Sequence, residues 1–188
     1  MKKILSLAFC LFFTFTLCAQ SQKYTALELK NAALEKENAA DSIQFISDNL
    51  SNTASPADRR SSLYFLGTLQ EQSGLYSEAS LSYAKAAGIS AGDASGMKKI
   101  TAEQLVLCAV RASLNSGDWE TAELYLNSAV RSSKNENVLA LVNLYSVWAE
   151  LIKAQNIENT KDSIELLKAY SSMSSMKSVK EKILLTLW

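Results

Sequence analysis

The stretch YFLGTLQEQSGLYSEASLSYAKAAG, residues 64–88, places small residues at regular intervals among large apolar ones. Apolar and small residues recur at helical spacing on both sides of Gly74, which indicates one helix before it and another after it. Glycine ends a helix at little cost because it readily adopts a positive φ. The stretch therefore predicts two helices joined by a tight turn, with small residues such as Gly67 and Ala79 allowing the helices to approach closely.

A second stretch repeats this pattern around Gly117. After each of the two glycines come, at identical offsets, an aromatic residue, an alanine, a large residue and a second alanine. The two series are Gly74, Tyr76, Ala79, Tyr83 and Ala86, and Gly117, Trp119, Ala122, Leu126 and Ala129. A pattern that recurs along a chain indicates repeated supersecondary units, each of which must bury one face against its neighbours.

The pattern resembles that of the tetratricopeptide repeat (TPR), a helix–turn–helix unit of about 34 residues. The resemblance covers residues 60–91 and 103–135, although Val110 stands in the second unit where the first has Gly67, and the usual closing proline is absent from both units. The resemblance implies an all-α fold of antiparallel helical hairpins stacked as a TPR-like right-handed α-solenoid, with the repeats in residues 58–188.

The regions that flank these two units have helical periodicity but lack the full pattern. Residues 20–57 are predicted to form an N-terminal helical hairpin, either a capping unit or a degenerate repeat, with Tyr24, Leu27 and Leu34 on its first helix. Residues 138–155 open a third repeat, which indicates a second helix after it.

The end of the chain bears on whether the repeats are complete. The second helix of the third repeat is expected in residues 156–172, and another amphipathic helix starts at residue 178 and stops at Trp188. A helical array normally ends in a unit with a polar outer face, which residues 178–188 lack. The last repeat is therefore predicted to be incomplete in a chain that is a fragment, with a natural end at Trp188 as the alternative.

Local capping signals mark where helices begin. Ser55 can cap a helix that has Pro56 at its first position, where proline is common. Thr101 opens the sequence TAEQ, which has the spacing of a capping box, and Asp118 can cap the next helix. The Gly- and Ser-rich residues 88–99 are predicted to form a long connection between the two repeats.

The first twenty residues, MKKILSLAFCLFFTFTLCAQ, have the pattern of an export signal. Lys2 and Lys3 precede a short apolar run, and small or polar residues follow it. Residues 1–19 are therefore predicted to be a signal peptide, and the protein is expected to be exported to the periplasm or cell envelope. Cleavage after Ala19 is favoured. Lipidation of Cys18 is the alternative, and only then would the protein be anchored to a membrane.

Composition and charge disfavour several classes of function. Hydrophobic residues make up 48% of the chain and charged residues 20%, which is typical of a globular protein. The 19 basic residues are balanced by 19 acidic ones, so the net charge does not favour nucleic acid as a partner. Histidine is absent, and no phosphate-binding loop, nucleophile motif or metal-ligand spacing occurs. No enzyme activity, cofactor or metal is therefore predicted, and Cys108 is expected to be a buried small hydrophobe.

The resemblance also implies a binding surface, because proteins of this repeat family line an inner groove with residues of each first helix. The predicted groove residues are Ser61, Tyr64, Thr68, Glu71 and Gln72 in the first unit, Gln104, Leu107, Arg111, Leu114 and Asn115 in the second, and Asn143, Ser146, Glu150 and Lys153 in the third. Tyr64 and Arg111 are the expected anchors, because aromatic residues and arginine dominate binding hot spots. Tyr83, Trp119 and Trp148 are instead expected in the core.

These features predict a non-enzymatic scaffold that binds a protein or peptide in the cell envelope. A rigid surface built from repeats loses little entropy on binding. Two alternatives are open. The repeats could be a spacer that supports a further domain beyond residue 188, for example one that binds peptidoglycan. Surface aromatic residues could also bind carbohydrate, as in an accessory protein of an enzyme.

Overall fold

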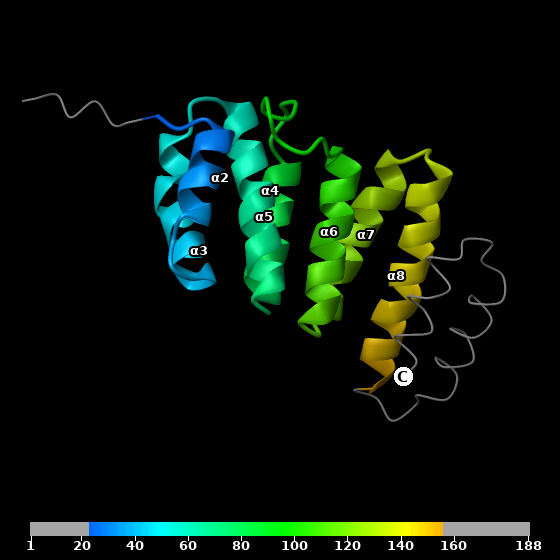
Figure 1. The fold of residues 1–188 in the computed structure, drawn as a ribbon. Coiled ribbons are helices and arrows are strands. Elements are labelled where there is room, and N and C mark those ends of the chain that lie inside the picture. Colours follow the sequence, from blue (N-terminus) through cyan, green and yellow to red (C-terminus); the bar gives the residue numbers. More distant parts are fainter. Residues whose placement is uncertain (1–22, 156–188) are drawn as a thin grey trace, which may run out of the picture.

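The computed structural model describes residues 23–155. These residues form seven α-helices, α2–α8, one short 3₁₀-helix and no β-strand. The only extended pairing in this range is a single parallel bridge between Tyr24 and Thr53. Figure 1 shows the helices side by side in one row, from α2 and α3 at one end to α8 at the other. The described part of the chain is therefore all-α, as predicted.

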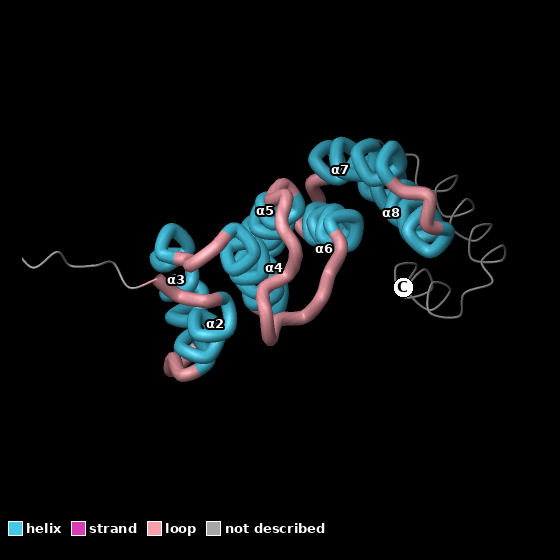
Figure 2. The backbone as a smooth tube through the Cα atoms, turned by 90° about the horizontal axis from the view of Figure 1, so that it is seen from above, coloured by secondary structure: helices cyan, strands magenta, loops and turns pink. Residues whose placement is uncertain are grey.

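Consecutive helices pair as hairpins. The helices are α2 (Ala26–Leu34), α3 (Ala39–Asn49), α4 (Pro56–Gln72), α5 (Tyr76–Ala87), α6 (Ala102–Asn115), α7 (Trp119–Ser132) and α8 (Glu136–Gln155), with the 3₁₀-helix η1 (Leu50–Asn52) after α3. Each helix from α2 to α7 packs on the next one, and α2 also contacts α4 while α6 contacts α8. Seen from above, α2, α4, α6 and α8 lie on one side of the row, and α3, α5 and α7 lie on the other (Figure 2).

The two glycine turns have the same geometry. Gly74 has φ of 76° and Gly117 has φ of 79°, in the left-handed region that favours glycine. After Gly74, the amide of the next residue donates to the carbonyl of Gln70 at 2.8 Å, and after Gly117 the equivalent amide donates to Ser113 at 3.0 Å. These bonds satisfy carbonyl groups that the end of a helix leaves free. The predicted tight turns are confirmed at both positions.

The predicted helix caps are also confirmed. The hydroxyl of Ser55 accepts from the amide of Asp58 at 3.1 Å at the start of α4, with Pro56 in the first turn. Thr101 opens α6 with a capping box, and Asp118 opens α7. Such caps stabilise a helix by about 1 kcal/mol each, so the sequence defines these three helix starts locally.

The α4–α5 hairpin is close-packed around Gly67. A Cβ atom at Gly67 would lie 2.8 Å from Cε1 of Tyr83 and 2.9 Å from its Cδ1. Tyr83 is 1% exposed, and Ala79 and Ala86 on the same helix are fully buried. The small residue at 67 therefore creates the space that the Tyr83 ring fills, as the spacing predicts.

Small side chains also lie where the α4–α5 hairpin packs on the α6–α7 hairpin. The Ser80 hydroxyl of α5 donates to the carbonyl of Ala109 of α6 at 3.1 Å and lies 2.7 Å from the hydroxyl of Ser113. Ala109 and Ala112 are fully buried at this contact. Short side chains bring α5 and α6 close together, and the buried hydroxyls are paired, which avoids the penalty for an unsatisfied polar group.

Gly67→Ala is expected to lower the free energy of unfolding by about 1 kcal/mol, although alanine is normally favoured over glycine within a helix by a similar amount. The added methyl group must displace the Tyr83 ring, and overpacking of this kind typically costs about 1–3 kcal/mol. Denaturant unfolding measures the difference. Gly88→Ala is the matched control, because a Cβ there would meet only backbone oxygens at 3.6 and 3.7 Å. A Gly67→Ala protein as stable as wild type would contradict the prediction.

Leu27 and Leu34 lie on α2 as expected, whereas Tyr24 precedes this helix and forms a bridge with Thr53. Leu27 and Leu34 are 39% and 59% exposed, whereas Leu29 and Ala33 are buried. The amide of Ala26 donates to the Asp58 carboxylate of α4 at 2.8 Å, so the face of α2 that begins at residue 26 turns toward α4. This tertiary contact sets the rotation of α2, and no local pattern in the sequence reveals it.

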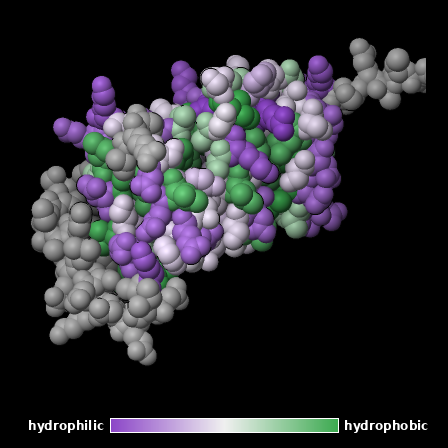
Figure 3. Space-filling view, turned by 180° about the vertical axis from the view of Figure 1, so that it is seen from behind, coloured by the Kyte–Doolittle hydropathy of each residue, from purple (hydrophilic) through white to green (hydrophobic). Residues whose placement is uncertain are grey.

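Large apolar residues are also exposed singly elsewhere. Leu81 of α5 is 54% exposed and Leu124 of α7 is 71% exposed. Figure 3 shows hydrophobic and hydrophilic residues mixed over the described part of the back of the molecule. Scattered apolar residues of this kind are normal on a protein surface and do not mark a binding site.

Several predictions fall outside the described residues. These are the signal peptide in residues 1–19 with Cys18, the second helix of the third repeat in residues 156–172, and the helix in residues 178–188. Among the helices of residues 23–155, none is both long and apolar enough to cross a membrane.

Candidate functional site

A cleft with a volume of about 350 Å³ lies where α4, α6 and α8 meet the loop before α6. We call it the α4–α6–α8 cleft. Its lining residues are Tyr64, Thr68, Glu71, Tyr83, Lys98, Lys99, Ile100, Gln104, Leu107, Cys108, Arg111, Leu141 and Tyr145. Because α4 and α6 are the first helices of consecutive hairpins, the cleft lies on the side of the row where a groove was predicted.

Most of the predicted groove residues of the first two units come together here. Tyr64, Thr68 and Glu71 of α4 line the cleft with Gln104, Leu107 and Arg111 of α6. Gln72 and Asn115 do not line it; each is the last residue of its helix and is exposed. Helical spacing therefore identifies the faces of α4 and α6 that carry the cleft residues, and Gln72 and Asn115 lie outside the cleft because they are at the helix ends.

Two other predicted groove residues lie in the core instead. Ser61 is 2% exposed, and its hydroxyl accepts from the amide of Ala94 at 3.0 Å. Leu114 is 2% exposed and packs in the apolar cluster between α6, α7 and α8. The expectation that both face the groove is wrong, because the loop covers residue 61 and neighbouring helices cover residue 114.

The residues of α8 that reach the cleft are Leu141 and Tyr145, which sequence reasoning missed. None of the four predicted residues of this helix lines the cleft. Lys153, for example, points toward α7, with its Nζ 4.8 Å from the centre of the Trp119 ring and 3.9 Å from Glu123. The third unit lacks the glycine and alanine pattern that sets the register in the first two.

A polar cluster fixes Arg111 in the floor of the cleft. Its Nε and Nη2 donate to the two carboxylate oxygens of Glu71 at 2.8 and 2.7 Å. The Tyr83 hydroxyl donates to the same carboxylate at 2.9 Å. A bidentate pair of this kind is strong and directional. Arg111 is therefore held by Glu71, so Tyr64 is the predicted anchor that has no such partner.

Burial and pairing shift the pKa values in this cluster. Burial opposes ionisation of Glu71, but the hydrogen bonds and charge of Arg111 outweigh it, so the pKa of Glu71 lies below its ordinary value of 4.5. Burial raises the pKa of Tyr83, and the charge of Glu71 raises it further. At neutral pH the carboxylate is therefore ionised and the phenol is a neutral donor.

The Glu71–Arg111 pair is expected to make stability depend on acid pH. A carboxyl group whose pKa is lowered by folding stabilises the native state above its unfolded pKa, and this contribution is lost as pH falls through the folded pKa. The free energy of unfolding should therefore decline below pH 4.5, the ordinary value for Glu71. Urea unfolding at a series of pH values measures this decline.

Glu71→Gln should weaken that decline and lower stability at neutral pH. Glu28→Gln is the comparison variant. Hydrogen bonds from Thr25 also lower the pKa of Glu28, but Glu28 is exposed to solvent outside the cleft, so this variant should change the acid decline much less than Glu71→Gln does. If the free energy of unfolding falls equally below pH 4.5 in wild type and in Glu71→Gln, the prediction for Glu71 is wrong.

Cys108 was expected to be a buried small hydrophobe, but it is only partly buried and lines the cleft. Burial still raises the pKa of its thiol, and the charge of Arg111 only partly opposes this effect. A thiol with a raised pKa is a poor nucleophile at neutral pH. Cys108 therefore contributes a small apolar surface to the cleft wall.

Tyr64 presents an aromatic surface to the cleft. Its ring centre lies 6.0 Å from that of Tyr83, with the rings tilted by 40°. Lys98 lies over the Tyr64 ring, with its Nζ 5.9 Å from the ring centre. Of the three aromatic residues expected in the core, Tyr83 is buried, whereas Trp119 and Trp148 are partly buried against the core.

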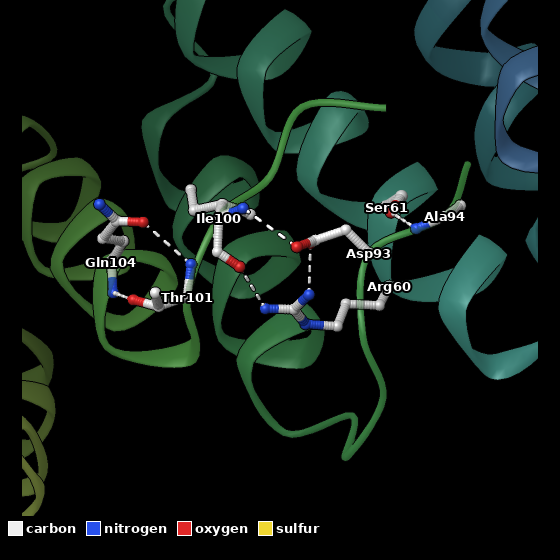
Figure 4. A network of polar contacts seen from close by, with 7 residues as sticks. All are labelled: Arg60, Ser61, Asp93, Ala94, Ile100, Thr101 and Gln104. Carbon is white, nitrogen blue, oxygen red and sulfur yellow. Dashed lines mark hydrogen bonds and ion pairs between the residues drawn. The ribbon is translucent and has the colours of Figure 1, made fainter. Parts of the chain in front are cut away.

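The loop of residues 88–101 is held against α4 by Arg60. The Arg60 side chain is 5% exposed and forms an ion pair with Asp93, and its Nη2 donates to the carbonyl of Ile100 at 2.6 Å. Asp93 also accepts from the amide of Ile100 at 3.2 Å. Figure 4 shows the guanidinium group contacting both loop residues, so one buried side chain fixes the part of the loop that leads to α6.

The charge of the cleft is predominantly positive. Arg111, Lys98 and Lys99 line it, and Glu71 is its single carboxylate. Because Glu71 pairs with Arg111, the two lysines of the loop supply the excess charge. Sequence reasoning missed them because they belong to the connection and not to a repeat helix, and only the fold brings them beside α4.

A second and larger cleft, of about 680 Å³, lies between η1, the start of α4 and the end of α5. It contains none of the predicted groove residues. Among residues 23–155, no group of three or more His, Cys, Asp or Glu side chains is arranged to hold a metal ion. The α4–α6–α8 cleft is therefore the site that combines predicted residues, exposed aromatic surface and unpaired charge.

Comparison with known proteins gives one short match. The model of the TP_0752_M family, described as a middle domain, matches residues 152–188. This segment is less than half of the chain and lies almost entirely outside the residues described above. No curated protein and no solved structure matches the chain.

Proposed function

We propose that this protein is a non-enzymatic, exported scaffold of TPR-like repeats that binds a segment of another protein in the α4–α6–α8 cleft. The observation that carries the proposal is the cleft itself. It is lined by the first helices of two consecutive hairpins and brings Tyr64, Gln104 and Arg111 to one surface. Export to the cell envelope is part of the proposal because residues 1–19 have the pattern of a signal peptide.

Two features of the fold support the repeat assignment. The turns at Gly74 and Gly117 have matching hydrogen bonds and matching positive φ values. The residues at equivalent positions after them are buried alike: Ala79, Tyr83 and Ala86 in α5, and Ala122, Leu126 and Ala129 in α7. Equal burial at equal offsets is what stacked copies of one supersecondary unit require. A right-handed superhelical stack of such units is the arrangement that we propose for the chain.

The mechanism of binding follows from the rigidity of the cleft. Tyr64 packs against buried Tyr83, and Arg111 is fixed by two hydrogen bonds to Glu71. A preformed site of this kind orders few side chains on binding, so more of the contact energy appears as affinity. Tyr64 supplies the apolar contact. The Oε1 of Gln104 accepts from the amide of Thr101, so its Nε2 supplies hydrogen-bond donors.

Cross-linking of the purified protein to an extract of the source organism's cell envelope, followed by mass spectrometry, tests the proposal. Wild-type protein should capture a specific partner, and Tyr64→Ala should lose it. Leu81→Ala is the matched control, because this residue is 54% exposed on α5 and does not line the cleft. A partner captured equally by Tyr64→Ala, or no specific partner at all, would overturn the proposal in favour of a spacer.

A further inference from the structure

The two lysines of the 88–101 loop form no ion pair within the described part of the chain. The ion pairs there join Arg60 with Asp93, Arg111 with Glu71, and Lys153 with Glu123 and Glu150. Lys98 and Lys99 are both exposed and both line the cleft. Two adjacent cations at the wall of a cleft, without an internal counter-ion, raise the local concentration of negatively charged ligands.

The loop that carries these lysines is fixed in place. Arg60 holds Asp93 and the carbonyl of Ile100, and the amide of Ala94 is bonded to Ser61. Lys98 and Lys99 lie between these attachment points. Attachment on both sides keeps this part of the loop beside the cleft, with Lys98 over the Tyr64 ring.

We infer that the segment bound in the α4–α6–α8 cleft is an acidic peptide, with Asp or Glu side chains facing Lys98 and Lys99 and an adjacent apolar side chain against Tyr64 and Leu141. This inference rests on the proposed function, since it specifies the partner of the same site. Charge complementarity carries it: the cleft has two cations in excess of its internal pair. Arg60 acts as a positioning residue, because it touches the loop and not the cleft.

The surroundings of the lysines favour a peptide over other anions. The wall beside them is apolar and aromatic, formed by Tyr64, Leu107 and Leu141, and such a wall accepts a side chain next to the acid. Nucleic acid needs an extended basic surface, but the full chain has 19 acidic residues for its 19 basic ones. The cleft of about 350 Å³ holds only a few side chains, which fits a short segment.

Selection from a phage-displayed library of random dodecapeptides on the full chain tests the inference. Selected peptides should be enriched in Asp and Glu, and Tyr64→Ala should abolish their binding. The double variant Lys98→Glu/Lys99→Glu should weaken binding by at least about 10-fold, since reversed charges repel the peptide. Lys85→Glu/Lys134→Glu is the matched control, because it makes the same change in net charge outside the cleft and should bind as wild type does.

Two further variants sharpen the readout. Glu71→Gln leaves Arg111 without its internal counter-ion and should strengthen binding of acidic peptides several-fold. Arg60→Met should weaken binding of an acidic peptide but not of the same peptide with Asn and Gln in place of Asp and Glu. Unfolding alone would weaken both peptides equally, so this difference separates positioning of the lysines from a merely structural role of Arg60.

The outcomes distinguish this inference from the function on which it rests. The inference is overturned if the selected peptides are neutral or basic and require Tyr64. It is also overturned if acidic peptides bind equally well to Lys98→Glu/Lys99→Glu. In both cases the proposed function as a peptide-binding protein still stands. No peptide that depends on Tyr64 would overturn both. The wild-type protein could instead sediment with phosphatidylglycerol vesicles, lose this binding in Lys98→Glu/Lys99→Glu, and select no acidic peptides. That result would overturn the inference and identify an anionic membrane surface as the ligand.

Discussion

Replacing Tyr83 by alanine is expected to lower the free energy of unfolding by about 3–5 kcal/mol, the usual range for removal of a large aromatic side chain from a core. Tyr83 is 1% exposed, and its ring fills the space left by Gly67. It also contacts the ring of Tyr64 at a centre-to-centre distance of 6.0 Å. The cavity would open between α4 and α5, where the backbone at Gly67 has no side chain to move into it. Denaturant unfolding followed by circular dichroism measures the loss.

Tyr83→Phe separates packing from hydrogen bonding. The ring stays, but the bond of 2.9 Å to the Glu71 carboxylate is lost, which should cost about 1–2 kcal/mol. Because Glu71 holds Arg111, this variant should also loosen the floor of the cleft, visible as broader NMR signals of the Arg111 side chain. If Tyr83→Ala costs no more than Tyr83→Phe, the ring does not fill the hairpin as the structure indicates.

Much of the hairpin architecture follows from local chemistry, which is why it could be predicted from the sequence. Gly74 and Gly117 end helices because of their backbone freedom, and Ser55, Thr101 and Asp118 begin them because their side chains accept from nearby amides. These effects act over a few residues. The spacing of small and large residues on a helix then determines which faces can meet.

The composition of the cleft depended on contacts that no local pattern encodes. Lys98 and Lys99 reach the site because Arg60 binds Asp93 and Ile100, which lie 33 and 40 residues away along the chain. Leu141 and Tyr145 reach it because α8 packs on both α6 and α7. Helical periodicity predicts which residues of α8 share a face, but it does not predict which of these faces packs on α6 and which on α7. The side chains that determine the charge of the cleft were therefore the ones missed.

Because Asp93 is the counter-ion of buried Arg60, its substitution should strongly destabilise the protein. Asp93→Ala is expected to lower the free energy of unfolding by about 3 kcal/mol, because it leaves the Arg60 charge buried without its counter-ion. The Arg60 side chain is 5% exposed, its Nε already has no hydrogen-bond partner, and the carbonyl of Ile100 accepts from it but carries no full charge. Urea unfolding of the single variant against wild type measures this loss.

The double variant Arg60→Met/Asp93→Ala completes the thermodynamic cycle. Replacing a buried ion pair by apolar side chains is often close to neutral, so the double variant should regain a large part of the stability that Asp93→Ala loses. It cannot regain all of it, because the amide of Ile100 loses the bond of 3.2 Å to Asp93.

The cycle discriminates between two roles of Asp93. Recovery in the double variant means that the carboxylate mainly compensates the Arg60 charge, whereas no recovery means that its bond to the loop backbone dominates. In the first case Arg60→Met alone should expose Asp93 to solvent and free the loop at moderate cost. Lys98 and Lys99 would then lose their fixed position at the cleft while the helices stay folded.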